Sequence, residues 1–205
     1  MKNKLLCLQI IATAALVAGC ASVTPTTEQQ AGYVIYDIKS DTGISASRLA
    51  DAIKVGLQKE SSQVQITSGI PPHPLPEKPG RFRMTSPFAG GGNLGVLLAA
   101  AGKSVQVPTC DDAILTARAG RTGMARYGES TSFFLCLLPY RDGYHLDIYS
   151  EFSKRSGGID PAALGAALAR SVVGDSSQFT SNTIASVVDS IKATGATVTF
   201  IEAYP

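Results

Sequence analysis

The sequence contains no tryptophan, only two histidines, and a charged fraction of only 17%. A charged fraction this low, together with 44% hydrophobic residues, excludes an intrinsically disordered chain. The absence of a Gly-X-Y period and of any repeat of about 20 to 50 residues excludes collagen-like and solenoid architectures. The 205 residues therefore predict one folded domain, or at most two small ones.

An excess of charge of either sign is also missing. The net charge of +2 comes from Lys2 and Lys4, because the other 16 basic residues balance the 16 acidic ones. A protein that follows a phosphate backbone needs a basic surface, often with interleaved aromatic residues, and neither occurs here. We therefore expect no nucleic-acid partner.

The N-terminus has the strongest sequence signal. Two lysines in the first four residues precede an uncharged, largely apolar run from Leu5 to Val17. This run is shorter than the roughly 20 residues of a membrane span, and it predicts a signal peptide over residues 1–19. The run ends in Leu16-Val17-Ala18-Gly19-Cys20, with small residues directly before a cysteine. This segment resembles the lipobox of bacterial lipoproteins.

The resemblance implies cleavage before Cys20, lipid on its thiol and acylation of the new amino terminus, with palmitate among the acyl chains. Several acyl chains anchor a protein firmly, whereas one binds only marginally. Ala21 and Ser22 follow, and neither is the aspartate that the lipoprotein pattern associates with the inner membrane. The expected location is therefore the periplasmic face of the outer membrane, rather than the inner membrane or the cell surface. An ordinary signal peptide with an incidental cysteine is the alternative.

Residues 20–31 are predicted to form a lipidated flexible tether, because they are polar and contain a proline. When extended, residues 21–31 reach at most about 36 to 40 Å. The folded part, predicted as a single periplasmic domain over residues 32–205, is thus held close to the membrane. Its expected partners are the membrane, through the lipid anchor, and another envelope protein.

Two cysteines remain once the signal peptide has left and Cys20 is lipidated. In an oxidising exported compartment, Cys110 and Cys136 are expected to form a disulfide. A Gly-Arg-Thr-Gly turn separates two strand-like runs between them. If residues 110–119 and 127–136 pair about this turn, the two cysteines lie opposite each other. A catalytic or metal-binding thiol is the alternative, although no Cys-x-x-Cys motif occurs.

Hydrophobic periodicity predicts helices and strands in the rest of the domain. Helices are expected at three apolar stripes: Leu49, Ile53 and Leu57 after Ser45; Leu164, Leu168 and Val172 after Asp160-Pro161; and Ile184, Val187, Val188 and Ile191 before Gly195. Strands are expected at Tyr33–Ile38, Gln63–Thr67 and Thr197–Ile201.

The centre of the domain is predicted to be a β-hairpin. Thr131–Leu138 is largely apolar on both faces, as in a central strand, and Asp142-Gly143 is a typical two-residue turn. This turn would pair Ile148 with Leu137 and place Cys136 on the face away from the core. Together, the elements predict an α+β fold, a mainly antiparallel sheet with two or three helices packed on one face.

Two features of the domain are candidates for a binding surface. The first is a polar strand face, interpreted as solvated, that comprises His145, Asp147, Tyr149 and Glu151. The second is residues 70–80, whose five prolines are typical of a semi-rigid extended loop. The candidate docking residues of this Pro-rich loop are Pro71, Pro72, Pro74 and Pro76. A loop that only crosses the surface is the alternative.

No motif of known chemistry is complete. Gly90–Gly95 fits G-x-G-x-x-G, but no strand precedes it, and Gly102-Lys103-Ser104 lacks the first glycine of a P-loop. Gly128–Ser132 lacks the closing glycine of a nucleophile elbow. We therefore predict no catalytic residue, no cofactor and no metal site. The apolar stretch Leu94–Ala101 is expected to be a buried helix, with a membrane- or partner-facing element as the alternative.

Two classes of function follow from these observations. The favoured one is a lipid-anchored envelope protein that works as a non-catalytic binding, scaffold or assembly module facing the periplasm. The alternative is a periplasmic hydrolase that uses His145 with a serine, or with a metal bound through His73 and His145. The lack of a complete catalytic signature favours the binding module.

Overall fold

A computed structural model of the chain describes residues 26–39, 43–88, 93–101, 105–121, 128–156 and 177–204. The predicted signal peptide, Cys20 and the helix expected after Asp160 lie outside these residues. The described elements are β1 (Thr26–Lys39), α2 (Ala46–Glu60), β2 (Gln63–Ser68), β3 (Arg83–Thr85), α3 (Asn93–Ala100), β4 (Val107–Thr109), β5 (Leu115–Arg121), β6 (Glu129–Tyr140), β7 (Gly143–Ser156), α5 (Ser177–Lys192) and β8 (Thr197–Tyr204).

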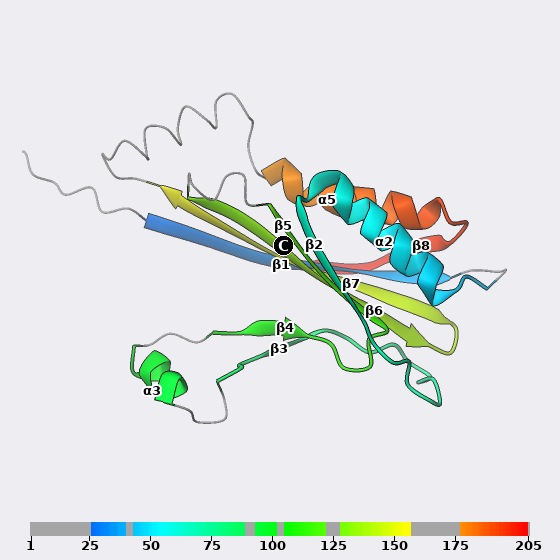
Figure 1. Cartoon of the computed structure of the whole chain (residues 1–205), viewed down its shortest axis with the longest axis horizontal. Coiled ribbons are helices and arrows are strands. Elements are labelled where there is room, and N and C mark those ends of the chain that lie inside the picture. The colour runs from blue at the N-terminus through cyan, green and yellow to red at the C-terminus, as the bar shows by residue number, and fades with distance from the viewer. Residues whose placement is uncertain are drawn as a thin grey trace, which may run out of the picture.

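Six strands form one antiparallel sheet in the order β2-β5-β6-β7-β1-β8. Helices α2 and α5 pack on one face of this sheet, whereas β3, α3 and β4 lie on the opposite side (Figure 1). The predicted α+β fold with a mainly antiparallel sheet is therefore confirmed.

Helix α2 forms where the apolar stripe predicts it. The Ser45 side chain accepts a hydrogen bond from the Arg48 N–H at 3.3 Å, which caps the first turn. Leu49, Ile53 and Leu57 are fully buried in the core between the helices and the sheet. Gly56 lets α5 approach closely, because a Cβ there would lie 2.6 Å from the Val187 Cα.

The central strand β6 is buried on both faces from residue 133 to residue 140, as predicted. The β6–β7 turn lies one residue earlier than expected, which shifts the strand register by two residues. Arg141 and Asp142 form the turn, and Ile148 pairs with Leu135 rather than Leu137. Gly143 instead begins β7, where a Cβ would lie 2.4 Å from the Ile38 carbonyl oxygen. A shift of two keeps every side chain on its predicted face, so Cys136 still lies away from the helices.

The hairpin of β5 and β6 forms, but the register predicted for its cysteines is wrong. Cys136 lies opposite Thr116, not opposite Cys110. Cys110 lies outside β5, in the segment between the end of β4 at Thr109 and the start of β5 at Leu115. A disulfide nevertheless joins Cys110 to Cys136, with 6.3 Å between their Cα atoms.

The predicted tether is shorter than expected, because Thr26–Ala31 belong to β1. These residues pair with β7 from Ser156 to Glu151, so their backbone groups are held although their side chains are exposed. Polar composition therefore indicates an exposed strand here, not a flexible segment.

Residues 81–110 form an excursion from the sheet, which we call the arm. It contains the two-stranded ladder of β3 and β4, with α3 between them in sequence. The expected helix at Leu94–Ala101 exists, but it is not buried, because Val96 is 61% and Leu97 66% exposed. The expectation failed because the arm carries the helix away from the core of the sheet (Figure 1).

Replacing both Cys110 and Cys136 with Ala should lower the free energy of unfolding by about 3 to 4 kcal/mol, since the disulfide closes a loop of about 26 residues. Urea unfolding of the variant and of the unreduced protein measures this loss. Reductant added to the unaltered protein should reproduce it. Equal stability of the oxidised protein and the double variant would contradict the prediction.

Candidate functional site

The face of the sheet opposite the helices has an ordered row of side chains. Strand pairing aligns Glu202 of β8 with Ile35 of β1, Ile35 with Asp147 of β7, and Asp147 with Cys136 of β6. Directly paired residues on neighbouring strands point to the same side, so these four lie in one line across the sheet. Both ends of the arm attach to this line.

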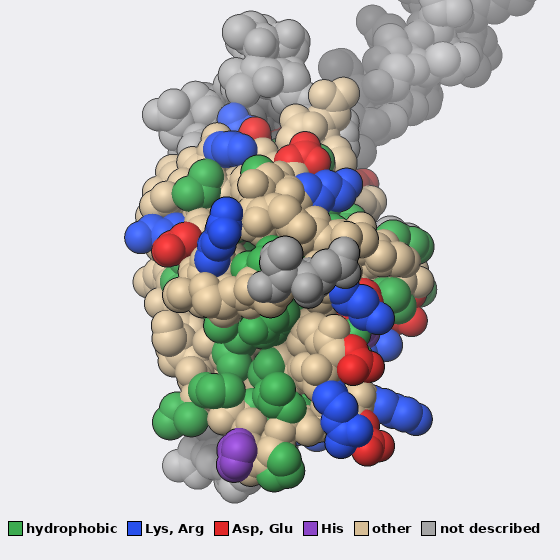
Figure 2. All heavy atoms as spheres, turned by 90° about the vertical axis from the view of Figure 1, so that its right-hand side faces the viewer, with side chains coloured by type: hydrophobic (Ala, Val, Ile, Leu, Met, Phe, Trp, Pro, Cys, Tyr) green, Lys and Arg blue, Asp and Glu red, His purple; other side chains and the backbone are tan. Residues whose placement is uncertain are grey.

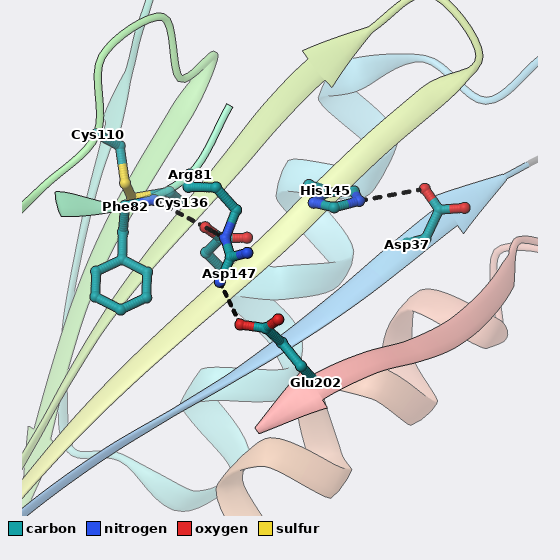
Figure 3. A network of polar contacts seen from close by, with 8 residues as sticks. All are labelled: Asp37, Arg81, Phe82, Cys110, Cys136, His145, Asp147 and Glu202. Atoms are coloured by element: carbon teal, nitrogen blue, oxygen red, sulfur yellow. Dashed lines mark hydrogen bonds and ion pairs between the residues drawn. A yellow bond between two sulfur atoms is a disulfide. The ribbon is translucent and has the colours of Figure 1, made fainter. Parts of the chain in front are cut away.

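Asp147 holds the first end of the arm. Its side chain is fully buried, and its Oδ2 accepts a hydrogen bond from the Phe82 N–H at 2.8 Å. The Arg81 Nε lies 4.0 Å from the same oxygen, and the Arg81 guanidinium also pairs with Glu202 (Figure 3). Burial raises the pKa of Asp147 to about 6, although the Phe82 N–H and Arg81 lower it. Its other oxygen, Oδ1, is buried and has no hydrogen-bond partner among the described residues.

A second polar group on the same face joins Asp37, Tyr140 and His145. The Tyr140 hydroxyl donates to the Asp37 Oδ1 at 2.7 Å, and the His145 Nε2 lies 3.8 Å from that oxygen (Figure 3 shows the histidine and aspartate). Burial lowers the pKa of His145, against the opposing effect of Asp37. Burial and the hydrogen bond to Asp37 raise the pKa of Tyr140, which keeps its hydroxyl a donor at neutral pH.

The predicted solvated face is therefore wrong. Asp147 is 1% exposed, the His145 side chain is 12% exposed, and only Glu151 of the four candidates is exposed. Phe82 covers this face, with its ring 5.3 Å from that of Tyr33 and 5.9 Å from that of Tyr149. Sequence alternation identifies the face correctly, but it does not show that the arm folds over it.

The Pro-rich loop is fastened to the sheet at both sides. The Gly69 N–H donates to the Ile114 carbonyl at 2.9 Å, and the Arg141 N–H donates to the Pro76 carbonyl at 3.0 Å. The Arg141 side chain also forms an ion pair with Glu77 at 3.1 Å. Of the four prolines proposed for docking, Pro71 lines a cavity, whereas Pro74 is exposed on the surface.

That cavity is an open cleft of about 640 Å³, between the Pro-rich loop, the start of α2, the end of β1 and the β6–β7 turn. Its apolar lining includes Ile38, Ile44, Ala50, Leu75, Ile114 and Tyr144. Lys39, Arg141 and Asp142 also line it. Figure 2, which views this end of the molecule, shows hydrophobic side chains gathered there beside charged ones.

The size and the lining of the cleft suit the binding of an apolar group. Ligand sites are typically concave, largely apolar and about 300 to 1,000 Å³ in volume, with a few polar groups that orient the ligand. Tyr140 links the cleft to the polar group beneath it, because it lines the cleft while its hydroxyl is held by Asp37. The cleft therefore combines an apolar lining with a tyrosine whose hydroxyl is held in one orientation.

Sequence reasoning did not find the cleft, because its lining comes from five separate segments of the chain. It also missed Asp37, Arg81 and Glu202. The Pro-rich loop was the one available signal, since Pro71 and Leu75 do line the cleft.

Within the described ranges, no group of three or more His, Cys, Asp or Glu residues is placed to hold a metal ion. None of the helices in that part of the chain is long and apolar enough to cross a membrane. The chain matches no protein-family model and no curated protein.

Asp147 should make stability fall as the pH rises from about 4 to 6. Its pKa is about 6 in the folded protein, above its ordinary value of 3.8, so the folded state holds the proton more tightly. The contribution of Asp147 to the free energy of unfolding is thus greatest below pH 4. About 2 to 3 kcal/mol of this contribution is lost as the carboxyl group ionises in the folded protein. Urea unfolding across this pH range should show a smaller fall for Asp147→Asn.

Glu151→Gln is the matched control for this measurement, since Glu151 is an exposed carboxylate on the same strand. This variant should keep the pH dependence of the unaltered protein. If the Asp147→Asn curve instead runs parallel to that of the unaltered protein, Asp147 is ionised at pH 4 and the prediction is wrong.

Proposed function

We propose that this protein is a lipid-anchored binding module of the bacterial envelope. In this proposal, Cys20 holds it on the periplasmic face of the outer membrane, and it acts as a non-catalytic binding, scaffold or assembly protein. The observation that carries the proposal is the apolar cleft at the end of the sheet, which offers a concave site of ligand size.

The direction of β1 relates the cleft to the proposed anchor. The strand begins at Thr26, and the six steps from Cys20 cover at most about 20 to 22 Å. The strand then runs about 40 to 45 Å to Lys39, which lines the cleft. An anchor on Cys20 would therefore lie at one end of the molecule, and the cleft at the other, facing away from that membrane.

This arrangement supports another envelope protein as the partner. A site that faces away from the anchoring membrane meets proteins of the periplasm or of the opposite membrane surface. The apolar lining suits an apolar segment of such a partner, and Lys39, Arg141 and Asp142 provide polar groups to orient it. The disulfide of Cys110 and Cys136 is in keeping with an exported protein.

The alternative, a periplasmic hydrolase that uses His145, has weaker support. In the described part of the chain, the His145 Nδ1 is buried without a hydrogen-bond partner, and Nε2 faces Asp37 rather than a serine. A general base must reach the proton that it removes, and this histidine is covered. Binding at the cleft needs no such uncovering of a buried group, because the cleft is open.

Filling the cleft should weaken binding of an apolar probe. Ala50→Phe places a large ring among the lining residues, and we expect it to weaken binding of N-phenyl-1-naphthylamine, followed by fluorescence, about tenfold or more. Val55→Phe is the matched control, because Val55 lies on the same helix, is 50% exposed and does not line the cleft. Equal affinities of the two variants would contradict the assignment of the site.

Removing the proposed lipid attachment site should release the protein from the membrane or leave it as an unprocessed precursor. Fractionation of cells that express the Cys20→Ser variant, followed by mass measurement of its N-terminus, tests this. Cys110→Ala with Cys136→Ala is the control, since it removes two other cysteines and should leave fractionation unchanged. Correct processing and membrane association of Cys20→Ser would refute the anchor.

A further inference from the structure

The tip of the arm exposes apolar side chains that the fold does not use. Val96 and Leu97 on α3 are 61% and 66% exposed, and the helix sequence Asn-Leu-Gly-Val-Leu-Leu-Ala-Ala is otherwise almost entirely apolar. No charged residue occurs anywhere between Arg83 and Lys103. Exposed apolar side chains gathered in this way indicate a surface that another phase or molecule covers.

The base of the arm is attached to the sheet on both sides. Its first end is bound to Asp147 through the Phe82 N–H, and its second end is joined to Cys136 by the disulfide. The β3–β4 ladder and the ion pair of Arg83 with Asp111 connect the two sides near these points. In the sequence, helix α3 thus lies between the two strands of a braced ladder.

Helix α3 lies at the end of the molecule that is nearest to the proposed lipid anchor. Figure 1 shows α3 at the same end of the long axis as the start of β1, and the β6–β7 turn, which borders the cleft, at the other end. The undescribed chain that leads back to Cys20 therefore departs from the end where α3 lies. If Cys20 carries lipid, the six steps to Thr26 keep this end within about 20 to 22 Å of the bilayer.

The charge of the arm is also compatible with contact to the surface of the bilayer. The arm holds three basic residues, Arg81, Arg83 and Lys103, and no acidic one. The first two pair with carboxylates outside the arm, and Lys103 follows α3 closely in the sequence. A basic residue next to an apolar helix favours contact with an anionic lipid surface, whereas an acidic residue would oppose it.

We infer that α3 is a second membrane contact, which lies in the interfacial layer of the same bilayer that holds the lipid on Cys20. Eight residues make a helix of about 12 Å, far shorter than a span of about 20 residues, so the contact is interfacial. This inference rests on the proposed anchor. Two separated contacts would fix the tilt of the domain and keep the cleft directed away from the bilayer.

A fluorescent reporter on α3 tests the inference in the full, lipidated protein. Leu97→Cys is labelled with an NBD group and reconstituted into vesicles of phosphatidylethanolamine and phosphatidylglycerol that contain nitroxide-labelled lipid. Cys110 and Cys136 are oxidised, so the label enters at one position. We expect the nitroxide to quench the NBD emission about twofold or more, as for a group at the headgroup boundary. Val96→Cys provides a second reporter if the first variant does not fold.

Val55→Cys on α2 is the control, because this position is equally a half-exposed apolar residue but belongs to the body of the domain. Its emission should change little. If the protein floats with the vesicles and position 97 is quenched no more than position 55, the second contact is overturned while the anchor stands. If the protein does not float, anchor and contact both fail. Energy transfer between labelled copies at position 97 without quenching would assign α3 to a second copy and also overturn the inference.

Discussion

The pair formed by Cys136 and Asp147 on adjacent central strands is the point on which the second face of the molecule depends. These two residues lie opposite each other in the β6–β7 register, and each binds a different end of the arm. A buried carboxylate is costly unless it is paired and hydrogen-bonded. The arm supplies the Phe82 N–H and the Arg81 guanidinium, so the two parts of the chain stabilise each other.

The same attachment also shapes the cleft. The Pro-rich loop leads directly into Arg81, and its other contacts are with Ile114 and Arg141. The wall that Pro71 and Leu75 contribute is therefore held by these contacts and by the attachment of Arg81 and Phe82 that follows it in the chain. The cleft wall and the first end of the arm thus share one attachment to the sheet.

Local patterns predicted most of the sheet and both of its packed helices. The stripes of α2 and α5, the Ser45 cap and the two-faced burial of β6 follow from periodicity and capping, which depend on residues close in sequence. The predictions that failed concern contacts between residues that are distant in the sequence. The register that would place Cys110 opposite Cys136 assumed that the cysteines belong to the paired strands, whereas Cys110 reaches Cys136 from the arm.

The candidate site was predictable only in part, for the same reason. Alternation places His145 and Asp147 on one face of β7, but Asp147 is covered by Phe82, about 65 positions earlier in the chain, and His145 lies against Tyr140 and Asp37. The cleft combines residues from six helices and strands with a loop, and no local pattern marks such a meeting point. The exposed helix α3 was expected to be buried because its composition is apolar, and composition does not reveal whether a helix is carried on an arm.

The length of β1 and its pairing on both sides have a mechanical consequence. This strand lies between β7 and β8, and its ladder with β7 extends from Thr26 to Ile38. Hydrogen bonds of an antiparallel ladder run perpendicular to the strands. A pull between a lipid on Cys20 and a partner at the far end would load these bonds together in shear, rather than one after another as in peeling. If Cys20 carries the proposed lipid, the domain is thus suited to bear tension along β1.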